Sequence, residues 1–249
     1  MSEEIVRIAM WSGPRNISTA LMRSFENRPD TAVIDEPFYA AYLAATGANH
    51  PMREEVLGAQ SADWRVVTEG LLGSVPDGRR VYYQKHMTHH MLPGIGREWA
   101  EQLRNAFLIR APEDVLLSYA AVRGQATLED IGVPQQRELF EREADRLGHA
   151  PPVIDSSDVL ADPRGVLGAL CAALGIPFFE QMLRWPAGKR ASDGVWAPAW
   201  YAAVERSTGF SAPRPPAKIA DLPDELKRVA DQARGSYERL TEFKLGANG

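Results

Sequence analysis

Residues 5–19 read IVRIAMWSGPRNIST, and this stretch decides the fold that the sequence predicts. Its first part, residues 5–11, is a nearly continuous apolar run, which is typical of a strand buried on both faces. A Gly-Pro turn follows, and a helical pattern then occupies about residues 17–27. A buried strand that passes through a tight turn into a helix is the beginning of a βαβ unit.

The alternation of short apolar runs and longer helical patterns continues along the chain. Strand-like runs occupy residues 31–35, 80–84, 106–110 and 152–155. Helical patterns occupy about residues 62–73, 113–122, 135–147, 163–174 and 222–243. Strands that alternate with helices predict a parallel sheet. We therefore expect a single α/β domain over residues 1–249, with a central parallel β-sheet flanked by helices and with loop segments at 49–62 and 188–216.

Composition and charge argue against several classes of protein. Lys and Arg number 28 and Asp and Glu 33 among 249 residues, so the net charge is −5, whereas a general nucleic-acid binder is usually basic. Cys171 is the one cysteine, which excludes an internal disulfide and fits a reducing compartment. Residues 1–4 are acidic and lack the basic region of a signal peptide, and the apolar stretch 166–179 is too short to span a bilayer. We expect a cytoplasmic protein without a membrane or nucleic-acid partner.

The turn after the first strand has the chemistry of a phosphate-binding loop. Such a turn directs backbone N–H groups and a helix N-terminus at one point, which attracts phosphate. Arg15 adds positive charge, and Ser18 and Thr19 add hydroxyl donors. An ordinary βα turn with a capping Ser or Thr fits the local sequence equally well. The loop is not a Walker A motif, because Ile17 stands in place of the second glycine and no lysine precedes Ser18. An ATP or GTP hydrolase is therefore disfavoured.

A second candidate phosphate site follows the fourth predicted strand, in residues 110–119 (RAPEDVLLSY). Arg110 comes at the C-terminal end of that strand, and open α/β sheets bind ligands at this edge. Pro112 suits the first turn of a helix, and Ser118 lies eight residues after Arg110. Taken alone, Arg110 could be a surface or salt-bridging arginine and Ser118 an ordinary helix residue.

Together the two segments resemble those of the sulfotransferase family that uses 3′-phosphoadenosine-5′-phosphosulfate (PAPS), in its bacterial, carbohydrate and tyrosyl-type branch. Residues 14–19 look like a variant of the family's Pro-Lys/Arg-Ser-Gly-Thr-Thr loop, which holds the 5′-phosphosulfate, with Ile17 in place of glycine. Residues 110–119 fit its Arg-x-Pro-x-Asp-x-x-x-Ser-Tyr segment, which holds the 3′-phosphate, and residues 154–178 are similar to a further strand–helix segment. The resemblance implies a P-loop-like sulfotransferase fold, PAPS as donor, no metal, and transfer of a sulfuryl group to a hydroxyl or amine of a small acceptor.

The resemblance also implies roles for individual residues. The donor-binding residues that it implies are Gly13, Pro14, Arg15, Asn16, Ile17, Ser18, Thr19, Arg110 and Ser118. Its catalytic residues are Glu36, Lys85 and His86. Glu36 follows the second strand, should face the phosphate loop, and matches the glutamate base of one branch. Lys85 is expected to end the third strand, where a family lysine contacts the sulfuryl group or the bridging oxygen. His86 is one position away from the histidine base of another branch, so we favour Glu36 as the base.

The catalytic assignments have alternatives. Glu36 could cap the helix that follows it, and its neighbour Asp35 is a second carboxylate at the same strand end. His86, His89 and His90 could form a metal site, which we disfavour because no carboxylate is spaced with them. They could equally be packing or surface residues.

The function as a whole has two alternatives. One is a P-loop kinase-like enzyme, against which the missing Gly-Lys and the Arg110/Ser118 pair argue. The other is a non-catalytic nucleotide-binding protein on the same fold, since a fold does not fix an activity. Residues 196–201 (WAPAWY) are the best candidate to line or close an acceptor pocket, although core packing is the default for most aromatic side chains.

Overall fold

Five strands make up the central sheet in the computed structural model, which describes residues 4–213 and 215–246. The strands are β1 (Val6–Ser12), β2 (Thr31–Asp35), β3 (Val81–Met87), β4 (Arg104–Ile109) and β5 (Val153–Asp155), in the order β2-β3-β1-β4-β5. β2 pairs in parallel with β3, and β4 pairs in parallel with β5. Parallel neighbours require crossover connections, which the helices of the chain supply. The α/β fold with a central parallel sheet, predicted from the sequence, is confirmed.

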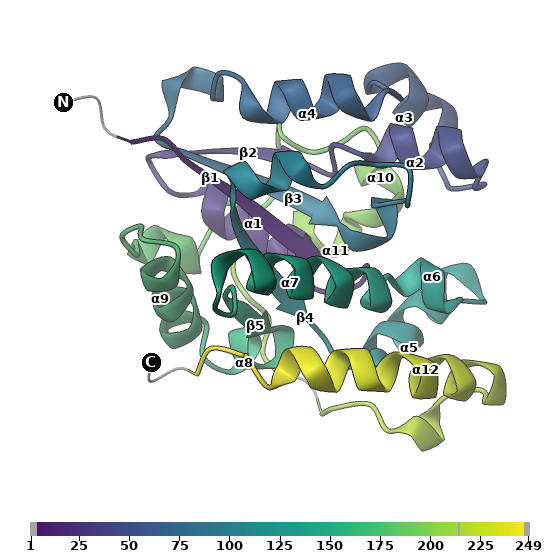
Figure 1. Cartoon of the computed structure of the whole chain (residues 1–249). Coiled ribbons are helices and arrows are strands. Elements are labelled where there is room, and N and C mark those ends of the chain that lie inside the picture. Colours follow the sequence, from purple (N-terminus) through teal and green to yellow (C-terminus); the bar gives the residue numbers. More distant parts are fainter. Residues whose placement is uncertain (1–3, 214, 247–249) are drawn as a thin grey trace. The chain divides into compact units, whose positions relative to one another are not determined.

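The helices of the chain carry labels in Figure 1. They are α1 (Ser18–Glu26), α2 (Tyr39–Thr46), α3 (Arg53–Ala59), α4 (Trp64–Leu72), α5 (Pro112–Arg123), α6 (Leu128–Ile131), α7 (Val133–Leu147), α8 (Ser156–Ala161), α9 (Pro163–Ala173), α10 (Ala197–Trp200), α11 (Ala202–Glu205) and α12 (Asp224–Thr241). A short 3₁₀ turn, Thr88–His90, follows β3.

The chain divides into two compact units, and boundaries between them fall within β1 and after the first residue of β4. The first unit contains Thr19–Arg104 and Phe179–Phe210 together with the beginning of β1. The second unit contains Trp11–Ser18, Asn105–Phe178 and the chain from Ser211 onward. The expectation of one domain over residues 1–249 stays a prediction.

The first unit is built around the parallel pair of β2 and β3. Its register places Asp35 opposite Lys85, at the C-terminal end of β2. Helix α2 packs against α3, as Figure 1 shows, through a buried cluster that also includes residues of α10 and the Tyr201 side chain. Burying each large apolar side chain of this kind stabilises the fold by about 1.5–3 kcal/mol.

The second unit is built around β4, β5 and the long helix α12. Helix α12 packs along α5 and α7 (Figure 1), and its apolar residues recur at helical spacing on one face. Leu226, Ala230 and Ala233 of that face are buried against Val115 and Leu116 of α5. This packing places α5, the helix that carries Ser118, on a rigid support.

The structure differs from the sequence predictions in several segments. Residues 49–62, predicted as a loop, contain α3, and residues 188–216 contain the short helices α10 and α11. The strand predicted at residues 80–84 continues to Met87, so Lys85 and His86 lie inside β3 and the expectation that Lys85 ends this strand is wrong. The sequence pattern stopped short because the polar residues 84–86 interrupt the apolar run, yet all three are buried.

In the part of the chain that the structure describes, no helix is both long and apolar enough to cross a bilayer. The expectation about a signal peptide rested on residues 1–4, of which residues 1–3 lie outside the described residues.

Candidate functional site

The loop between β1 and α1 has an unusual backbone for its sequence. Arg15 has φ 58° and Ile17 has φ 47°, both in the left-handed region that glycine adopts easily. For a β-branched residue such a φ is an outlier, and it costs on the order of 1–3 kcal/mol. Ile17 therefore adopts this conformation at a cost in strain, and surrounding contacts must hold it there.

Hydrogen bonds in the second unit hold this loop. The side-chain amide of Asn16, which is buried, donates to the carbonyl of Leu108 in β4 over 2.6 Å. The Gln136 amide of α7 donates to the carbonyls of Trp11 and Leu108 over 3.1 and 2.8 Å. These bonds join the end of β1, the loop and β4 through side chains that water does not reach.

Gly13 is required by a close approach at the start of the loop. A Cβ atom at this position would lie 2.5 Å from the carbonyl oxygen of Ile131 in α6, which is far inside contact distance. Any larger residue would therefore displace either the loop or the end of α6.

The second unit brings the two predicted phosphate segments into direct contact. Nε of Arg15 donates to Oγ of Ser118 over 2.9 Å, and Nη1 of Arg110 donates to the carbonyl of Arg15 over 2.6 Å. Burial lowers the pKa of the Arg15 guanidinium from its ordinary value, yet arginine stays charged at neutral pH. Two guanidinium groups and a hydroxyl form a donor set suited to phosphate.

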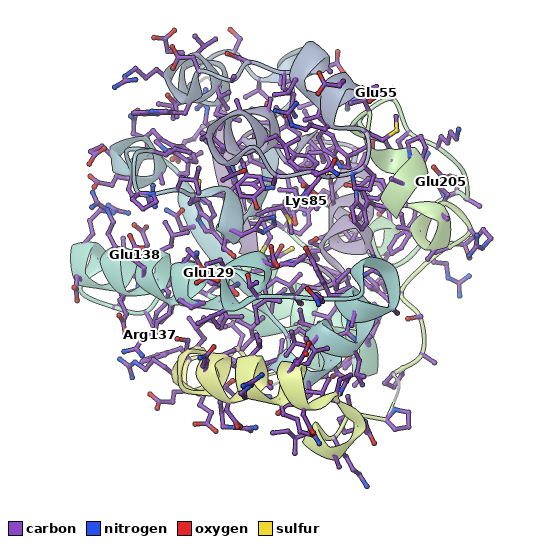
Figure 2. The ribbon with its side chains drawn as sticks, turned by 90° about the vertical axis from the view of Figure 1, so that its right-hand side faces the viewer. Glu55, Lys85, Glu129, Arg137, Glu138 and Glu205 are labelled. Carbon is purple, nitrogen blue, oxygen red and sulfur yellow. The ribbon has the colours of Figure 1, made fainter. Side chains whose placement is uncertain are left out.

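The first unit holds a network of charged groups centred on Lys85. Its Nζ donates to Oδ1 of Asp35 over 2.8 Å, to Oε1 of Glu36 over 2.7 Å and to Oη of Tyr201 over 2.8 Å. A lysine ammonium has three hydrogens, so all three are used. Figure 2 places Lys85 in the interior, whereas Glu55 of the same unit lies at the periphery.

Burial and charge act in opposite directions on this network. Burial lowers the pKa of Lys85, but Asp35, Glu36 and Tyr201 outweigh burial and raise that pKa well above its ordinary value. Burial raises the pKa of Glu36, and the nearby Lys85 opposes this rise without cancelling it. Burial and the Asp35 carboxylate raise the pKa of Tyr201, which therefore keeps its hydroxyl proton. The network therefore contains a protonated Lys85 bonded to the Glu36 carboxylate, whose pKa is raised.

The backbone of Glu36 is also strained. Its φ is 40°, and its N–H donates to the carbonyl of Lys85 over 3.0 Å. Its own carbonyl accepts from the N–H of Tyr39 over 3.1 Å and from the side chain of Gln60 over 3.2 Å. Strain that surrounding bonds maintain in this way occurs most often at functional sites.

Tyr201 is a member of the network that the sequence did not identify. Its hydroxyl donates to Oδ2 of Asp35 over 2.6 Å and accepts from Nε1 of Trp196 over 3.1 Å. Trp196 and Tyr201 belong to the segment 196–201 that was predicted to line an acceptor pocket, and both are buried. The aromatic composition of this segment was the one sequence feature that drew attention to Tyr201. That composition gave no indication of a contact with Lys85.

The histidines of β3 and the following turn are buried. Burial lowers the pKa of His86 to about 3, and burial with a smaller effect of His50 lowers the pKa of His89 to about 3. His86 packs near the rings of Phe38 and Trp99, with centroid distances of 5.7 and 5.3 Å. Among the described residues, no three His, Cys, Asp or Glu side chains are arranged to hold a metal ion.

A parallel α/β sheet with a phosphate-type loop after its first strand defines a broad class of proteins that bind phosphorylated ligands. The sulfotransferase domain family matches residues 6–233, and the chain belongs to this family. The resemblance inferred from the sequence is thereby confirmed.

Two curated relatives come from Arabidopsis thaliana and are called branched-chain-amino-acid aminotransferase-like proteins 1 and 2. They are 40% and 35% identical to this chain over 208 and 207 residues, which is 83% of the chain in each case. The matched region is 37% and 36% of the length of these relatives, so the chain spans little more than a third of each.

Solved sulfotransferases share the fold. A sulfotransferase domain from the curacin biosynthetic pathway has a TM-score of 0.53 and 18% identity, and covers 94% of this chain and 99% of that one. A sulfotransferase from Alicyclobacillus acidocaldarius has a TM-score of 0.58 and 14% identity, with 96% and 97% covered. A mouse sulfotransferase solved with PAP has a TM-score of 0.54 and 14% identity, with 96% and 90% covered. The roles of individual site residues stay predictions.

Proposed function

We propose that this sulfotransferase moves a sulfuryl group from PAPS to a hydroxyl or amine of a small acceptor. The observation that supports the donor assignment most directly is the contact between Arg15 and Ser118, because the two segments that resemble the donor-binding motifs meet in one cluster with Arg110. Their guanidinium and hydroxyl donors fit a ligand with phosphate groups at its 3′ and 5′ positions. A mouse relative in fold was solved with PAP.

Bound PAPS would supply the activated sulfuryl group. The residues of this chain would then have three tasks. Arg15, Arg110 and Ser118 would hold the phosphates, Glu36 would take the proton of the acceptor, and Lys85 would stabilise negative charge that develops during transfer. Glu36 is a better base than His86, because a pKa of about 3 makes the imidazole a weak base at neutral pH whereas the pKa of Glu36 is raised.

The two alternative functions meet specific objections. A kinase-like reaction lacks the lysine that precedes Ser18 in a Walker A loop. In a non-catalytic nucleotide-binding protein the Lys85 network would have no role. Burying two carboxylates and an ammonium costs folding free energy, whereas well-packed apolar side chains at the same positions would not have this cost.

The test combines binding and product formation. Calorimetry with 3′,5′-adenosine bisphosphate (PAP), AMP and ATP should give the tightest binding for PAP. Incubation with PAPS and a panel of phenols, alcohols and amines should give a sulfated product by mass spectrometry. PAP binding without any sulfated product would favour the non-catalytic alternative, and phosphorylated product from ATP would favour the kinase alternative. Equal affinity for PAP and AMP would contradict the donor assignment.

A further inference from the structure

The three hydrogen bonds of Lys85 are not equivalent. The side chains of Lys85 and Asp35 are each 1% exposed, whereas Glu36 keeps 12% exposure. Asp35 and Tyr201 are also bonded to each other over 2.6 Å, so these two acceptors form a closed triangle with the ammonium. Glu36 lies outside this triangle. Its bond to Lys85 is the one that can open without disrupting the other two.

The position of Tyr201 depends on a segment that is itself fixed at several points. Asp193 forms a buried ion pair with Arg23 of α1, with Nη2 and Oδ1 2.6 Å apart. The next residue, Gly194, donates its N–H to Oδ2 of Asp35 over 3.3 Å. A Cβ at Gly194 would lie 2.1 Å from the indole of Trp196, so glycine is required for this approach.

The tyrosine hydroxyl is oriented as well as placed. Trp196 donates its indole N–H to Oη of Tyr201 over 3.1 Å, and Tyr201 donates its own hydrogen to Asp35. One lone pair of the oxygen is thereby left for Lys85. A tyrosine that served only to fill the core would need none of these bonds, as Tyr83 illustrates: its buried hydroxyl has no hydrogen-bond partner among the described residues.

We propose that Tyr201 is a positioning residue for Lys85. Tyr201 and Asp35 each hold one of the three ammonium hydrogens, and the third hydrogen is bonded to Glu36. Glu36 releases this third hydrogen when its carboxylate takes up a proton. This inference rests on the proposed function. The proton moves from the acceptor hydroxyl to Oε1 of Glu36, and the acceptor oxygen forms a bond to sulfur as the bond from sulfur to the departing phosphate oxygen breaks. The electron pair of the broken bond stays on that phosphate oxygen. The released Lys85 hydrogen then faces the new negative charge.

The test compares Tyr201→Phe with Tyr83→Phe, which makes the same chemical change in the same unit at a buried tyrosine whose hydroxyl has no hydrogen-bond partner among the described residues. The first readout uses protein without any ligand. Competitive acetylation, read for each of the five lysines by mass spectrometry, measures the reactivity of Lys85 against Lys227 on the surface of α12. Loss of one hydrogen bond should raise the relative reactivity of Lys85 roughly two- to tenfold in Tyr201→Phe, and Tyr83→Phe should leave it unchanged.

The second readout is the pH profile of turnover. Without the Tyr201 hydroxyl, Lys85 bonds more tightly to Glu36 and lowers the pKa of that carboxyl. The acidic limb of kcat should then move to lower pH, kcat at neutral pH should fall, and the Kd of PAP should stay within twofold. A purely structural role of Tyr201 would not move the acidic limb. Trp196→Phe removes the N–H that orients Oη of Tyr201. It should shift the Lys85 reactivity and the acidic limb of kcat in the same directions as Tyr201→Phe, but by smaller amounts. If Tyr201→Phe fails to fold, Trp196→Phe takes its place in the test.

The outcomes separate this inference from the proposed function. Identical acetylation and identical pH profiles for Tyr201→Phe and Tyr83→Phe would overturn the positioning role. Raised Lys85 reactivity in a protein that binds no PAP would support the positioning of Lys85 and would overturn the donor assignment instead. Raised reactivity together with a shifted acidic limb supports both.

Discussion

Nε of Arg15 and Oγ of Ser118 lie 2.9 Å apart although 103 residues separate them in the sequence. Arg15 belongs to the loop that follows β1, and Ser118 belongs to the second turn of α5. The bond joins the segment that resembles a 5′-phosphosulfate loop to the segment that resembles a 3′-phosphate site. A ligand with two phosphate groups would compete with this bond and replace it with charge-assisted hydrogen bonds.

The first prediction concerns the choice of nucleotide. Arg110→Ala should weaken PAP binding by roughly ten- to a hundredfold, because a charge-assisted hydrogen bond contributes about 1.5–3 kcal/mol. AMP, which lacks the 3′-phosphate, should lose much less affinity. Calorimetry with both ligands measures the difference. Arg137→Ala on α7, where the arginine pairs with Glu141, is the matched control and should leave both affinities unchanged.

The result also distinguishes two uses of Arg110. Its Nη1 supports the carbonyl of Arg15, so Arg110→Ala could weaken the loop as a whole. Equal losses of affinity for PAP and AMP would indicate this supporting role and contradict recognition of the 3′-phosphate. Ser118→Ala removes a neutral hydroxyl that also accepts the hydrogen bond of Arg15, and it should cost PAP a few-fold more affinity than AMP.

The second prediction concerns the strained loop. At an ordinary backbone position, glycine is less stable than alanine by about 0.5–1 kcal/mol. At Ile17, with φ 47°, this order should be reversed, because alanine strains the left-handed conformation and glycine does not. Ile17→Gly should therefore unfold at the same or a higher denaturant concentration than Ile17→Ala. If Ile17→Ala is clearly the more stable variant, the loop does not have the backbone described for it.

Much of the fold could be predicted from local patterns. The runs that became β1 and β2 are short, apolar and bounded by turns, and their bounds were right to within about one residue. A helix after Glu36 was considered, but the bounds of α2 were not predicted, because its buried residues, Tyr39–Leu43, follow one another without a break and show no amphipathic period. The helices α10 and α11 have four residues each, too few for any period to appear.

The site was predictable only where a motif carried it. Glu36 and Lys85 were named from a resemblance, and the structure brings them together. The part played by Asp35 depends on the register that places it opposite Lys85, which requires the strand pairing to be known. Tyr201 reaches Lys85 across 116 residues, and no local pattern encodes a contact over that separation.

The third prediction concerns stability at acid pH. Burial lowers the pKa of His86 and of His89 from 6.5 to about 3, so both imidazoles are neutral in the folded protein. Between pH 6.5 and about 3 the unfolded chain carries protons on these residues that the folded chain does not. The free energy of unfolding should therefore fall as the pH is lowered through this window, by about 1.4 kcal/mol per pH unit for each imidazole.

Variants can isolate the contribution of a single histidine. Urea unfolding at several pH values measures the free energy of unfolding as a function of pH. For His86→Gln the slope of this free energy against pH should be smaller by the contribution of one imidazole. His149→Gln makes the same substitution at an exposed histidine and is the control for it. A slope that is the same for His86→Gln and for the wild type would mean that His86 titrates normally in the folded protein.

The last prediction chooses the base. Glu36→Gln keeps the size of the side chain and removes its basicity, and a positioned base contributes about 10²–10⁴-fold to a rate. Turnover with PAPS and an acceptor that the wild type sulfates should fall by that order, while the Kd of PAP should stay nearly the same. Glu55→Gln makes the same change at an exposed glutamate of α3 (Figure 2) and should retain full activity. His86→Asn should have a milder effect than Glu36→Gln, because the buried imidazole with a pKa of about 3 is a poor base at neutral pH. If His86→Asn abolishes turnover and Glu36→Gln remains near the wild type, the imidazole is the base and Glu36 serves only to hold Lys85.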